Sequence, residues 1–463
     1  MFTGSVSSIK LMGRNSIFYP FEESVNALLS CNMITDYVSL YNMIGRRQLL
    51  KTCAPAVVMP SFPAILSGKN PNTRLRVGVM GLSRGKAHIA GFTGIDNAEI
   101  AYVCDVDKNR LASGIKYAAA RQGGKEPKGV TDFREILEDK EVDILSIAAP
   151  NFWHAPAAIL ACDAKKQVYV EKPGSHNAHE AKLIVEAARK NKCLVQMGNQ
   201  RRSLPSYREG ISKIKDGVLG NLRYARCWYD NHRPSIGRGK KVPAPDWLDW
   251  NLWQGPAPDR PYKDNLVHYN WHWHWHYGGG ELANNGVHAL DIARWGLGVD
   301  FPIRVTCNGG RYHHDDDQET PDTADATYDF GKVGISWHGS SCLQRKHEKN
   351  SFVSIYGDKG VMAFESSGYR IYDMDGKVTE ENVPLFTDLP HFKNFADGIR
   401  EGSALNAEIS DAQKSSMMCH LGNIAYRMRT EIRFDSKTQR ITDNPAAEKL
   451  WGREYREGWK PKV

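Results

Sequence analysis

The chain has 463 residues, of which 41% are hydrophobic and 25% charged, and its net charge at pH 7 is +8. These proportions are ordinary for a globular protein, and the length allows two or three domains with substantial cores. The modest charge, with no basic block, argues against a nucleic-acid partner. Nine cysteines without paired spacing predict neither a disulfide framework nor a zinc ribbon. No run of eighteen apolar residues occurs, so we expect no transmembrane helix.

Residues 1–68 have the character of an N-terminal arm rather than a domain. Arg46 and Arg47 stand before a mildly apolar stretch, residues 52–66, in a pattern that resembles a twin-arginine export signal. We therefore predict an export signal over residues 43–68, a start of translation at Met43, and a periplasmic or otherwise exported protein. An ordinary arm on a cytoplasmic protein stays open as the alternative, because prolines interrupt the apolar stretch.

A strand, a glycine-rich turn and a helix follow one another between residues 74 and 93. Residues 74–80 form a short apolar strand, residues 81–88 the turn, and the helical pattern begins at Ile89. This order suits a dinucleotide pyrophosphate, because glycines let the backbone approach the phosphates and a helix N-terminus supplies free N–H groups. The match is imperfect, since a strict G-x-G-x-x-G motif has glycine in place of Ser83. We assign these turn residues to cofactor binding: Gly81, Ser83, Arg84, Gly85 and His88.

The next predicted strand, residues 98–105, ends in an acid. Asp105 comes about 24 residues after Gly81, the spacing of the carboxylate that accepts hydrogen bonds from an adenosine ribose. An acid at this position favours NAD over NADP, because it would repel a 2′-phosphate. A helix cap is the alternative role for an acid at this point, and Asp107 stands close enough for the two acids to divide the roles.

Three more apolar strands follow and alternate with two helical segments. The strands cover residues 143–150, 167–170 and 194–201, and the helices cover residues 155–164 and 178–192. This alternation predicts a parallel, doubly wound sheet, and hence an NAD-binding Rossmann domain over residues 74–199. Ligands bind at the carboxyl ends of the strands in such a sheet. From those ends we assign Asn151, His154, Glu171 and Lys172 to the cofactor, and Asn199 and Arg201 to the substrate.

Lys172 stands directly after the strand at residues 167–170, within a Glu-Lys-Pro sequence. At the end of a parallel strand its ammonium can hydrogen-bond the hydroxyl of an alcohol substrate that lies beside a nicotinamide ring. Lysine suits this role because its pKa falls readily when the side chain is desolvated near other charges. The sequence therefore indicates dehydrogenation of a sugar or polyol. The alternative is a surface lysine that closes a strand before a turn proline.

The second half of the chain is dominated by strand patterns. They cover residues 222–229, 323–330, 334–341, 351–356 and 361–365, and helices are expected over residues 391–401 and 408–429. Antiparallel meanders of this kind form one large sheet. We therefore predict an α/β domain for substrate binding and oligomerisation over residues 200–463.

Residues 269–277 alternate aromatic and histidine side chains. If the segment is extended, its period of two places His272, His274 and His276 on one face and three tryptophans on the other. Three such histidines could ligate a transition metal, but no carboxylate or cysteine stands at a convincing spacing, and we predict no metal. Aromatic faces beside imidazoles also suit a sugar cleft, and simple packing stays open. We assign Trp271, His272, Trp273 and His274 to substrate binding.

Several motifs in order resemble one family, the Gfo/Idh/MocA oxidoreductases, named for glucose-fructose oxidoreductase and inositol dehydrogenase. The motifs are Glu-Lys-Pro at 171–173, Trp-Asn-Leu-Trp-Gln-Gly-Pro-Ala-Pro at 250–258, Gly-Val-His-Ala-Leu-Asp at 286–291 and Asn-Ile-Ala-Tyr at 423–426. The resemblance implies a Rossmann domain followed by an α/β domain whose open, mostly antiparallel sheet often forms the oligomer interface, so we expect a dimer or tetramer. It also implies that Lys172 orients and polarises the reacting hydroxyl while His288 exchanges its proton.

The chain departs from this family at one position. Many members carry an aspartate four residues before the histidine that matches His288, and this chain has Asn284. Asparagine can hydrogen-bond a sugar hydroxyl but cannot hold a proton, so we assign Asn284 to substrate binding. The local pattern resembles a branch that oxidises the C3 hydroxyl of glucosides. Asp291 follows His288 by three positions and is expected to orient the imidazole or touch substrate; a helix-stabilising acid is the alternative.

We therefore expect an NAD-dependent enzyme, with NAD held tightly, that oxidises a hydroxyl of a sugar, glucoside or polyol. Two other functions stay open. Some relatives oxidise a sugar transiently so that elimination or hydrolysis can follow, which makes a glycosidase or lyase without net oxidation. A non-catalytic sugar-binding protein on the same fold is the second.

Overall fold

The computed structural model describes residues 74–442 and 444–463. The predicted export signal and the start at Met43 lie outside these described residues. Within the described part of the chain, no helix is both long enough and apolar enough to cross a membrane.

The first layer is a six-stranded parallel sheet with the order β3-β2-β1-β4-β5-β6. Its strands are β1 (Leu75–Met80), β2 (Ala98–Cys104), β3 (Lys128–Val130), β4 (Ile144–Ile147), β5 (Gln167–Val170) and β6 (Val195–Met197). Its helices are α1 (Gly85–Thr93), α2 (Lys108–Arg121), α3 (Arg134–Glu138), α4 (Asn151–Asp163) and α5 (Ala178–Asn191). The central strands are buried along their length, as expected for a sheet covered on both faces. This is the predicted Rossmann fold.

The second layer is a ten-stranded sheet with the order β14-β13-β12-β11-β7-β10-β9-β8-β15-β16, in which β7 and β10 are parallel and every other pair is antiparallel. Its strands are β7 (Leu222–Asp230), β8 (Arg304–Gly310), β9 (Thr323–Asp329), β10 (Gly334–Ser340), β11 (Val353–Gly357), β12 (Val361–Phe364), β13 (Tyr369–Tyr372), β14 (Val378–Asn382), β15 (Ile432–Asp435) and β16 (Arg440–Thr442). The large, mostly antiparallel sheet is thus confirmed.

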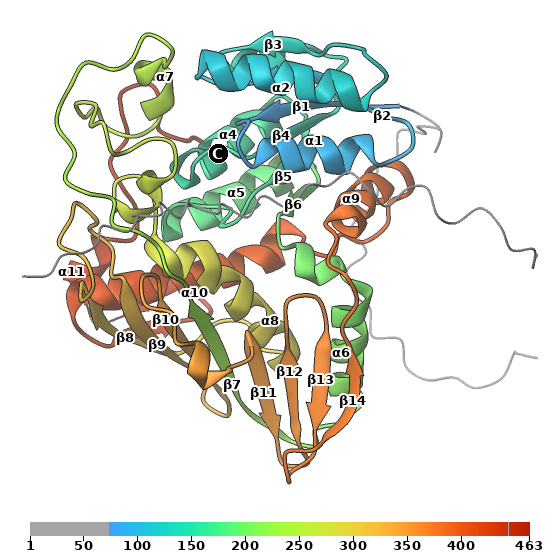
Figure 1. Cartoon of the computed structure of the whole chain (residues 1–463), viewed down its shortest axis with the longest axis vertical. Coiled ribbons are helices and arrows are strands. Elements are labelled where there is room, and N and C mark those ends of the chain that lie inside the picture. Colours follow the sequence, from blue (N-terminus) through green and yellow to red (C-terminus); the bar gives the residue numbers. More distant parts are fainter. Residues whose placement is uncertain (1–73, 443) are drawn as a thin grey trace, which may run out of the picture. The chain divides into compact units, whose positions relative to one another are not determined.

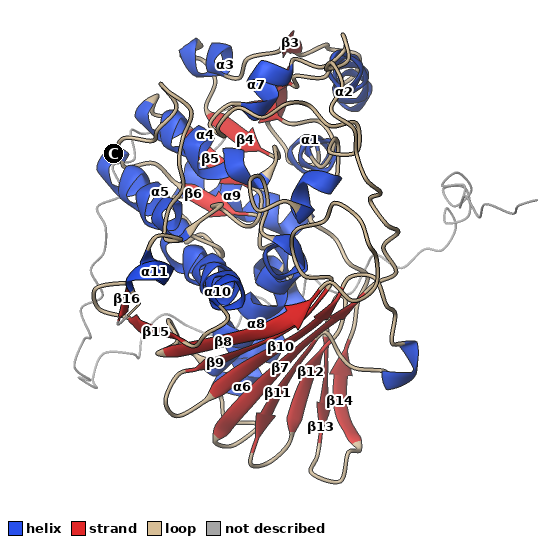
Figure 2. Cartoon of the chain, turned by 90° about the vertical axis from the view of Figure 1, so that its left-hand side faces the viewer, coloured by secondary structure: helices blue, strands red, loops and turns tan. Residues whose placement is uncertain are grey.

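Helices connect the two layers. They are α6 (Pro205–Lys215), α7 (Trp250–Gln254), α8 (Val287–Leu297), α9 (Leu389–Glu401), α10 (Ile409–Met428) and α11 (Pro445–Glu448), with a π-helical turn at Leu282–Gly286 leading into α8. Short 3₁₀ turns occupy Gln200–Ser203, Asn270–Trp273 and Lys346–Glu348. Figures 1 and 2 show α8 and α10 lying along one face of the large sheet. Helix α10 also packs against α5, and α9 returns to pack against α1.

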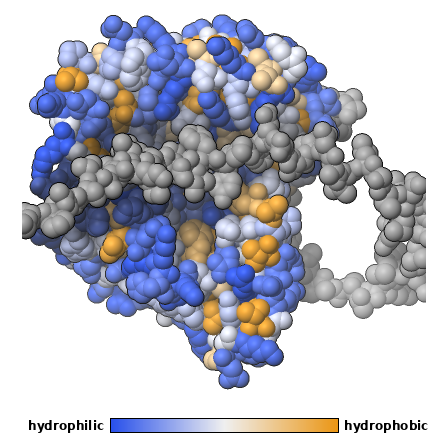
Figure 3. Space-filling view, in the orientation of Figure 1, coloured by the Kyte–Doolittle hydropathy of each residue, from blue (hydrophilic) through white to orange (hydrophobic). Residues whose placement is uncertain are grey.

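The surface in the orientation of Figure 1 is mostly hydrophilic, with apolar side chains scattered among polar ones (Figure 3). Over the described residues the most exposed large apolar side chains are Leu385, Tyr312 and Met374. Leu385 belongs to the loop between β14 and α9. The residue that follows it, Phe386, lines the cavity described below.

Residues 269–277 are not a strand, so the condition under which their histidines would share one face is not met. Asn270–Trp273 is a 3₁₀ turn, and the imidazole of His272 stacks on the indole of Trp271 with ring centroids 3.6 Å apart. His274 instead faces Glu319, with Nδ1 and Oε1 3.6 Å apart, and His276 lies 2.8 Å from the carbonyl of Pro258. The three histidines therefore do not share a face. No cluster of metal-ligating side chains occurs among the described residues.

Candidate active site

A cavity of about 470 Å³ opens at the carboxyl ends of the parallel strands. One wall comes from the residues that follow β1, β2, β4, β5 and β6. The opposite wall comes from the second part of the chain, chiefly a segment that we call the strap, residues 247–272, and the loop before α9. The carboxyl edge of a doubly wound sheet is where such folds bind their ligands.

Gly81 is the tightest point of the wall formed by the first layer. Its φ of +86° is in the left-handed region, and a Cβ there would lie 2.7 Å from the carbonyl oxygen of Ala148. Only glycine fits, because any side chain would collide with the backbone of Ala148 and strain this φ angle. Helix α1 begins just beyond, at Gly85, without a side-chain cap. The arrangement fits a dinucleotide pyrophosphate held by helix N–H groups.

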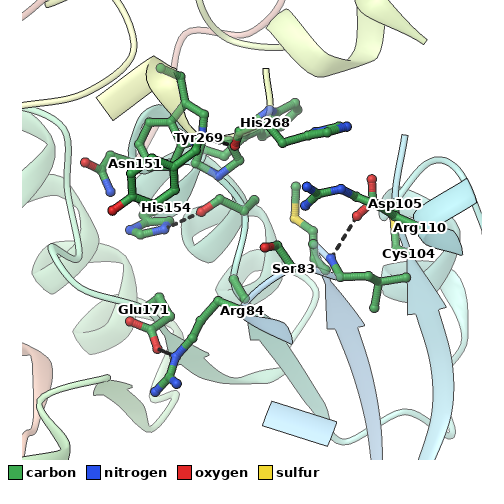
Figure 4. Close-up of a pocket in the computed structure, with 18 of the residues that line it drawn as sticks. Ser83, Arg84, Cys104, Asp105, Arg110, Asn151, His154, Glu171, His268 and Tyr269 are labelled. Carbon is green, nitrogen blue, oxygen red and sulfur yellow. Dashed lines mark hydrogen bonds and ion pairs between the residues drawn. The ribbon is translucent and has the colours of Figure 1, made fainter. Parts of the chain in front are cut away.

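Asp105 and Asp107 have different roles, as Figure 4 partly shows. Asp105 accepts hydrogen bonds from the backbone N–H groups of Leu82, at 2.8 Å, and of Asp107, at 3.0 Å. Burial raises its pKa, although these two N–H groups act in the opposite direction. Asp107 caps α2 through the N–H groups of Asn109 and Arg110. Each oxygen of Asp105 keeps a second lone pair, and that carboxylate lines the cavity where the ribose of an adenosine is expected.

Glu171 is the centre of a buried charge network. Its Oε1 accepts from Arg84 Nε at 2.9 Å and lies 3.2 Å from His88 Nε2 (Figure 4 shows the first contact). Burial opposes ionisation of this carboxyl, but Arg84 and His88 together hold its pKa well below the usual range. Arg84 also donates to Asp388, at 2.8 Å, at the start of α9. His88 is fully buried with its other nitrogen 2.8 Å from Ser146, so it supports Glu171 from behind and does not line the cavity.

Lys172 extends from the same strand end toward the second part of the chain. Its Nζ donates to the backbone carbonyl of Asn284, at 2.7 Å, and to the side-chain oxygen of Asn284, at 3.0 Å. The Asn284 amide nitrogen in turn lies 3.4 Å from Glu281. Burial lowers the pKa of Lys172, against the attraction of Glu171. Asn284 therefore touches the lysine directly, at the position where many family members carry an aspartate.

His288 stands in the first turn of α8 and lines the same cavity as Lys172. Burial lowers its pKa well below the ordinary value for histidine, and the charges of Lys172 and Arg201 add to this effect. The imidazole is therefore neutral near pH 7 and able to accept a proton.

Asp291 does not line the cavity, although the sequence led us to expect that it orients His288 or touches substrate. Its two oxygens accept from Arg202 at 2.8 Å each, and Oδ1 also accepts from Ser415 at 2.7 Å. The carboxylate is 1% exposed. Asp291 thus ties α8 to the start of the second part of the chain and to α10.

Two further side chains of the first layer reach the cavity. Asn151 is the first residue of α4, and His154 follows one turn later. The His154 ring lies between two carbonyl oxygens, with Nδ1 2.5 Å from Pro173 and Nε2 2.7 Å from Ala149. The ring therefore connects the ends of β4 and β5 beside Lys172.

The strap is tied to the start of α2. The N–H of Lys108 donates to the carbonyl of Trp247, and the N–H of Asp249 donates to the carbonyl of Val106, both at 2.9 Å. His268 Nε2 lies 2.8 Å from Asp107 Oδ2. The strap thus crosses the end of the cavity where Asp105 stands.

The structure brings most of the predicted site residues to one cavity. Those that line it are Gly81, Ser83, Arg84, Asp105, Asn151, His154, Glu171, Lys172, Arg201, Trp271, His272, Asn284 and His288. Those that do not are Gly85, His88, Asn199, Trp273, His274 and Asp291. Lining residues that the sequence did not single out include Arg110, Gln200, His268, Tyr269, Phe386 and Asp388. Phe386 and Asp388 lie in a loop without any motif, so no sequence signal identified them.

The fold and the cavity define a Rossmann-type oxidoreductase. Residues 75–199 match the family model "Oxidoreductase family, NAD-binding Rossmann fold", and residues 232–461 match "Oxidoreductase family, C-terminal alpha/beta domain". The chain belongs to the Gfo/Idh/MocA family, and its cofactor is NAD.

Curated relatives match over part of their length. Inositol 2-dehydrogenase of Salmonella typhimurium is 31% identical over 150 residues, which are 32% of this chain and 43% of that enzyme. A glycosyl hydrolase family 109 protein of Shewanella pealeana is 29% identical over 163 residues, 34% of this chain and 35% of that one. The matched segments thus span less than half of each relative.

Solved structures match over most of the chain at low identity. A levoglucosan dehydrogenase in complex with NADH and levoglucosan has a TM-score of 0.60 and 18% identity, covering 78% of this chain and 99% of that one. An aldose-aldose oxidoreductase from Caulobacter crescentus in complex with glycerol also has a TM-score of 0.60, at 16% identity, covering 78% and 100%. At these identities the likeness shows the shared fold.

Proposed function

We propose that this protein oxidises a hydroxyl of a sugar, glucoside or polyol with NAD as hydride acceptor. The observation that carries the proposal is the meeting of Lys172 and His288 in one cavity with the Gly81 turn and Asp105. The first pair has the chemistry to handle a C–OH group, and the second pair has the geometry for a dinucleotide. The glucoside C3 hydroxyl remains the expected position, from the sequence around His288.

The residues divide the reaction between them. When bound, NAD supplies the acceptor for the hydride that leaves the carbinol carbon. His288, neutral because of its burial, takes the hydroxyl proton as the C–O bond becomes a carbonyl. Lys172, held by Asn284, donates a hydrogen bond to the same oxygen and stabilises the negative charge that develops on it. Asp105 would hold the adenosine ribose and disfavour a 2′-phosphate, so NAD is preferred over NADP.

The strap supports a second part of the proposal, that NAD is held tightly. It is fixed to α2 by two backbone hydrogen bonds and the contact of His268 with Asp107. A nucleotide at the Asp105 end would have to leave past these contacts. Tight retention suits an exported enzyme that acquires NAD before export, and the periplasmic location and the dimer or tetramer stay predictions of the sequence.

The direct test is absorbance near 340 nm on the purified protein, with and without added NAD, against glucose, methyl glucosides and inositol. A continuous rise with one of them establishes the dehydrogenase and its substrate class. A single burst that matches the enzyme concentration indicates retained NAD without an external acceptor. No absorbance change with any sugar, although NAD is released on denaturation, contradicts net oxidation.

A transient oxidation is the second candidate, and the match to glycosyl hydrolase family 109 proteins favours it. In that case the sugar is first oxidised, an elimination or hydrolysis follows, and the oxidised carbon is then reduced again by the NADH that formed. NADH therefore does not accumulate. Release of p-nitrophenol from a nitrophenyl glycoside, dependent on NAD but without net NADH, distinguishes this reaction from dehydrogenation.

A further inference from the structure

Two cations line the reacting end of the cavity without a carboxylate partner among the described residues. The cavity has four lining carboxylates, and each has donors of its own: Asp105 has backbone N–H groups, Asp132 has Arg134, and Glu171 and Asp388 share Arg84. Within residues 74–442 and 444–463, the ammonium of Lys172 contacts only neutral oxygen atoms, both of Asn284. Arg201 stacks on aromatic rings, with its guanidinium 4.7 Å from Phe352 and 5.9 Å from Phe386.

Arg201 is held in place without being neutralised. It hydrogen-bonds the Tyr207 hydroxyl, while its Nε is buried and has no hydrogen-bond partner in the described part of the chain. A guanidinium presents donors in a planar fork that suits carboxylate and phosphate oxygens. A buried donor without a partner carries a free-energy cost.

The position of Arg201 places it on the substrate side and not on the NAD side. The sheet order puts β6, which precedes Arg201, three strands away from β1, which precedes the pyrophosphate turn. At about 4.8 Å per strand this separation is about 14 Å. The two rings on which Arg201 stacks, Phe352 and Phe386, belong to the second part of the chain.

We infer that the sugar oxidised here carries one anionic group, a carboxylate or a phosphate ester, which Arg201 binds while Lys172 and His288 hold the reacting hydroxyl. This inference rests on the proposed function. Asn284 makes the site suitable for an anion, because an aspartate at that position would neutralise Lys172 and repel the ligand. A neutral sugar would leave Arg201 without a charged partner.

The test compares matched ligands on the full chain with NAD present, by isothermal titration calorimetry. Methyl glucuronide is compared with methyl glucoside, galacturonate with galactose, and glucose 6-phosphate with glucose. We expect at least one anionic sugar to bind about tenfold or more tightly than its neutral partner, and the preference to shrink as salt rises. Preference for the uronates alone identifies a carboxylate, and preference for the phosphate alone identifies a phosphate ester.

Arg201→Gln is expected to lower the affinity for the anionic sugar by about 10- to 100-fold, the effect of losing a charge-assisted hydrogen bond, while the affinity for the neutral partner changes little. Arg201→Lys keeps the charge and should retain part of the preference. Arg223→Gln removes the same charge from β7, outside the cavity, and should change neither affinity. Thermal unfolding of each variant shows that it is folded.

Two results would overturn the inference: equal or tighter binding of every neutral sugar, or binding of no anionic sugar by protein that holds NAD. The wild-type comparison decides this even where a variant does not fold. Steady NADH formation from a neutral sugar, without any preference for an anionic sugar, would support the dehydrogenase activity and contradict the binding of an anionic group by Arg201. A clear preference for an anionic sugar, without NADH formation from any sugar, would support the anion site and contradict the dehydrogenase activity.

Discussion

The two ends of the cavity are built in different ways. At the Asp105 end the main chain makes most of the contacts. The backbone N–H groups of Leu82 and Asp107 satisfy the carboxylate, and Gly81, with a φ of +86°, packs directly against the backbone of Ala148. At the Lys172 end side chains from separate elements meet, and the two cations there have only neutral partners among the described residues. The first end suits a cofactor common to the family, and the second can vary with the substrate.

Lys172→Met is expected to separate the two ends most strongly. Loss of the ammonium should lower turnover by about 10²- to 10³-fold, the usual contribution of a positioned donor to the charge that develops on the reacting oxygen. NAD affinity should change much less than turnover, because Asp105 and the turn at Gly81 are untouched. Turnover is followed at 340 nm, NAD binding by calorimetry and folding by thermal unfolding. Near-normal turnover in the variant would contradict the role of Lys172.

Asp291→Ala tests whether the acid behind the reacting end is structural. Removing one partner of the buried pair with Arg202 should cost about 1–3 kcal/mol of stability, because two buried hydrogen bonds are lost and only Asp411, 3.2 Å away, remains as a countercharge. Guanidinium denaturation followed by tryptophan fluorescence measures the loss. Asp325→Ala, which removes a 61% exposed carboxylate that faces His338, is the control and should cost less than about 1 kcal/mol. Unchanged stability with altered pH dependence of turnover would instead support a role in orienting His288.

Sequence could predict the cofactor end better than the reacting end, for a physical reason. The bounds of β5 were predicted as residues 167–170 and found there, and Asp107 caps α2 as the alternative interpretation had it. The bounds of a short strand and the cap of a helix depend mainly on residues that are close in the sequence. The strand β3 was missed because it has three residues, two of them exposed. Phe386, Gln200 and Asp388 enter the cavity from loops whose placement depends on distant packing.

The segment at residues 269–277 shows the limit of periodicity. Its alternation of aromatic and histidine residues would place the three histidines on one face only if the segment were extended. The backbone instead makes a 3₁₀ turn, and each histidine finds a different neighbour: Trp271, Glu319 and the carbonyl of Pro258.

Acid should weaken the fold through four histidines, of which His391 and His420 are buried and His272 and His276 are partly buried. Burial lowers the pKa of His272 and His420 to about 3, and of His276 and His391 to about 4. In the unfolded chain these groups bind protons near pH 6.5. Between pH 6.5 and 5 the unfolded state therefore holds more protons than the folded state, and stability falls as pH falls.

Denaturation midpoints at pH 7.5, 6.0 and 5.0 measure this slope. His420→Gln should reduce the slope by one proton, about 1.4 kcal/mol per pH unit. Stability that is flat across the window in the wild type would contradict the neutral, buried state of these rings.

The smallest expected effect is at the strap. His268→Ala removes the contact with Asp107 but leaves the two backbone hydrogen bonds that fix the strap to α2. Because the His268 side chain is partly exposed, its contribution should be under about 1 kcal/mol, which corresponds to a two- to fivefold faster loss of NAD. The rate is read from the NAD that remains with the protein after timed gel filtration, and Lys172→Met serves as the comparison because it should change that rate less than His268→Ala does. A larger effect of Lys172→Met than of His268→Ala on NAD retention would mean that the nucleotide is held from the reacting end, and the division between the two ends would then fail.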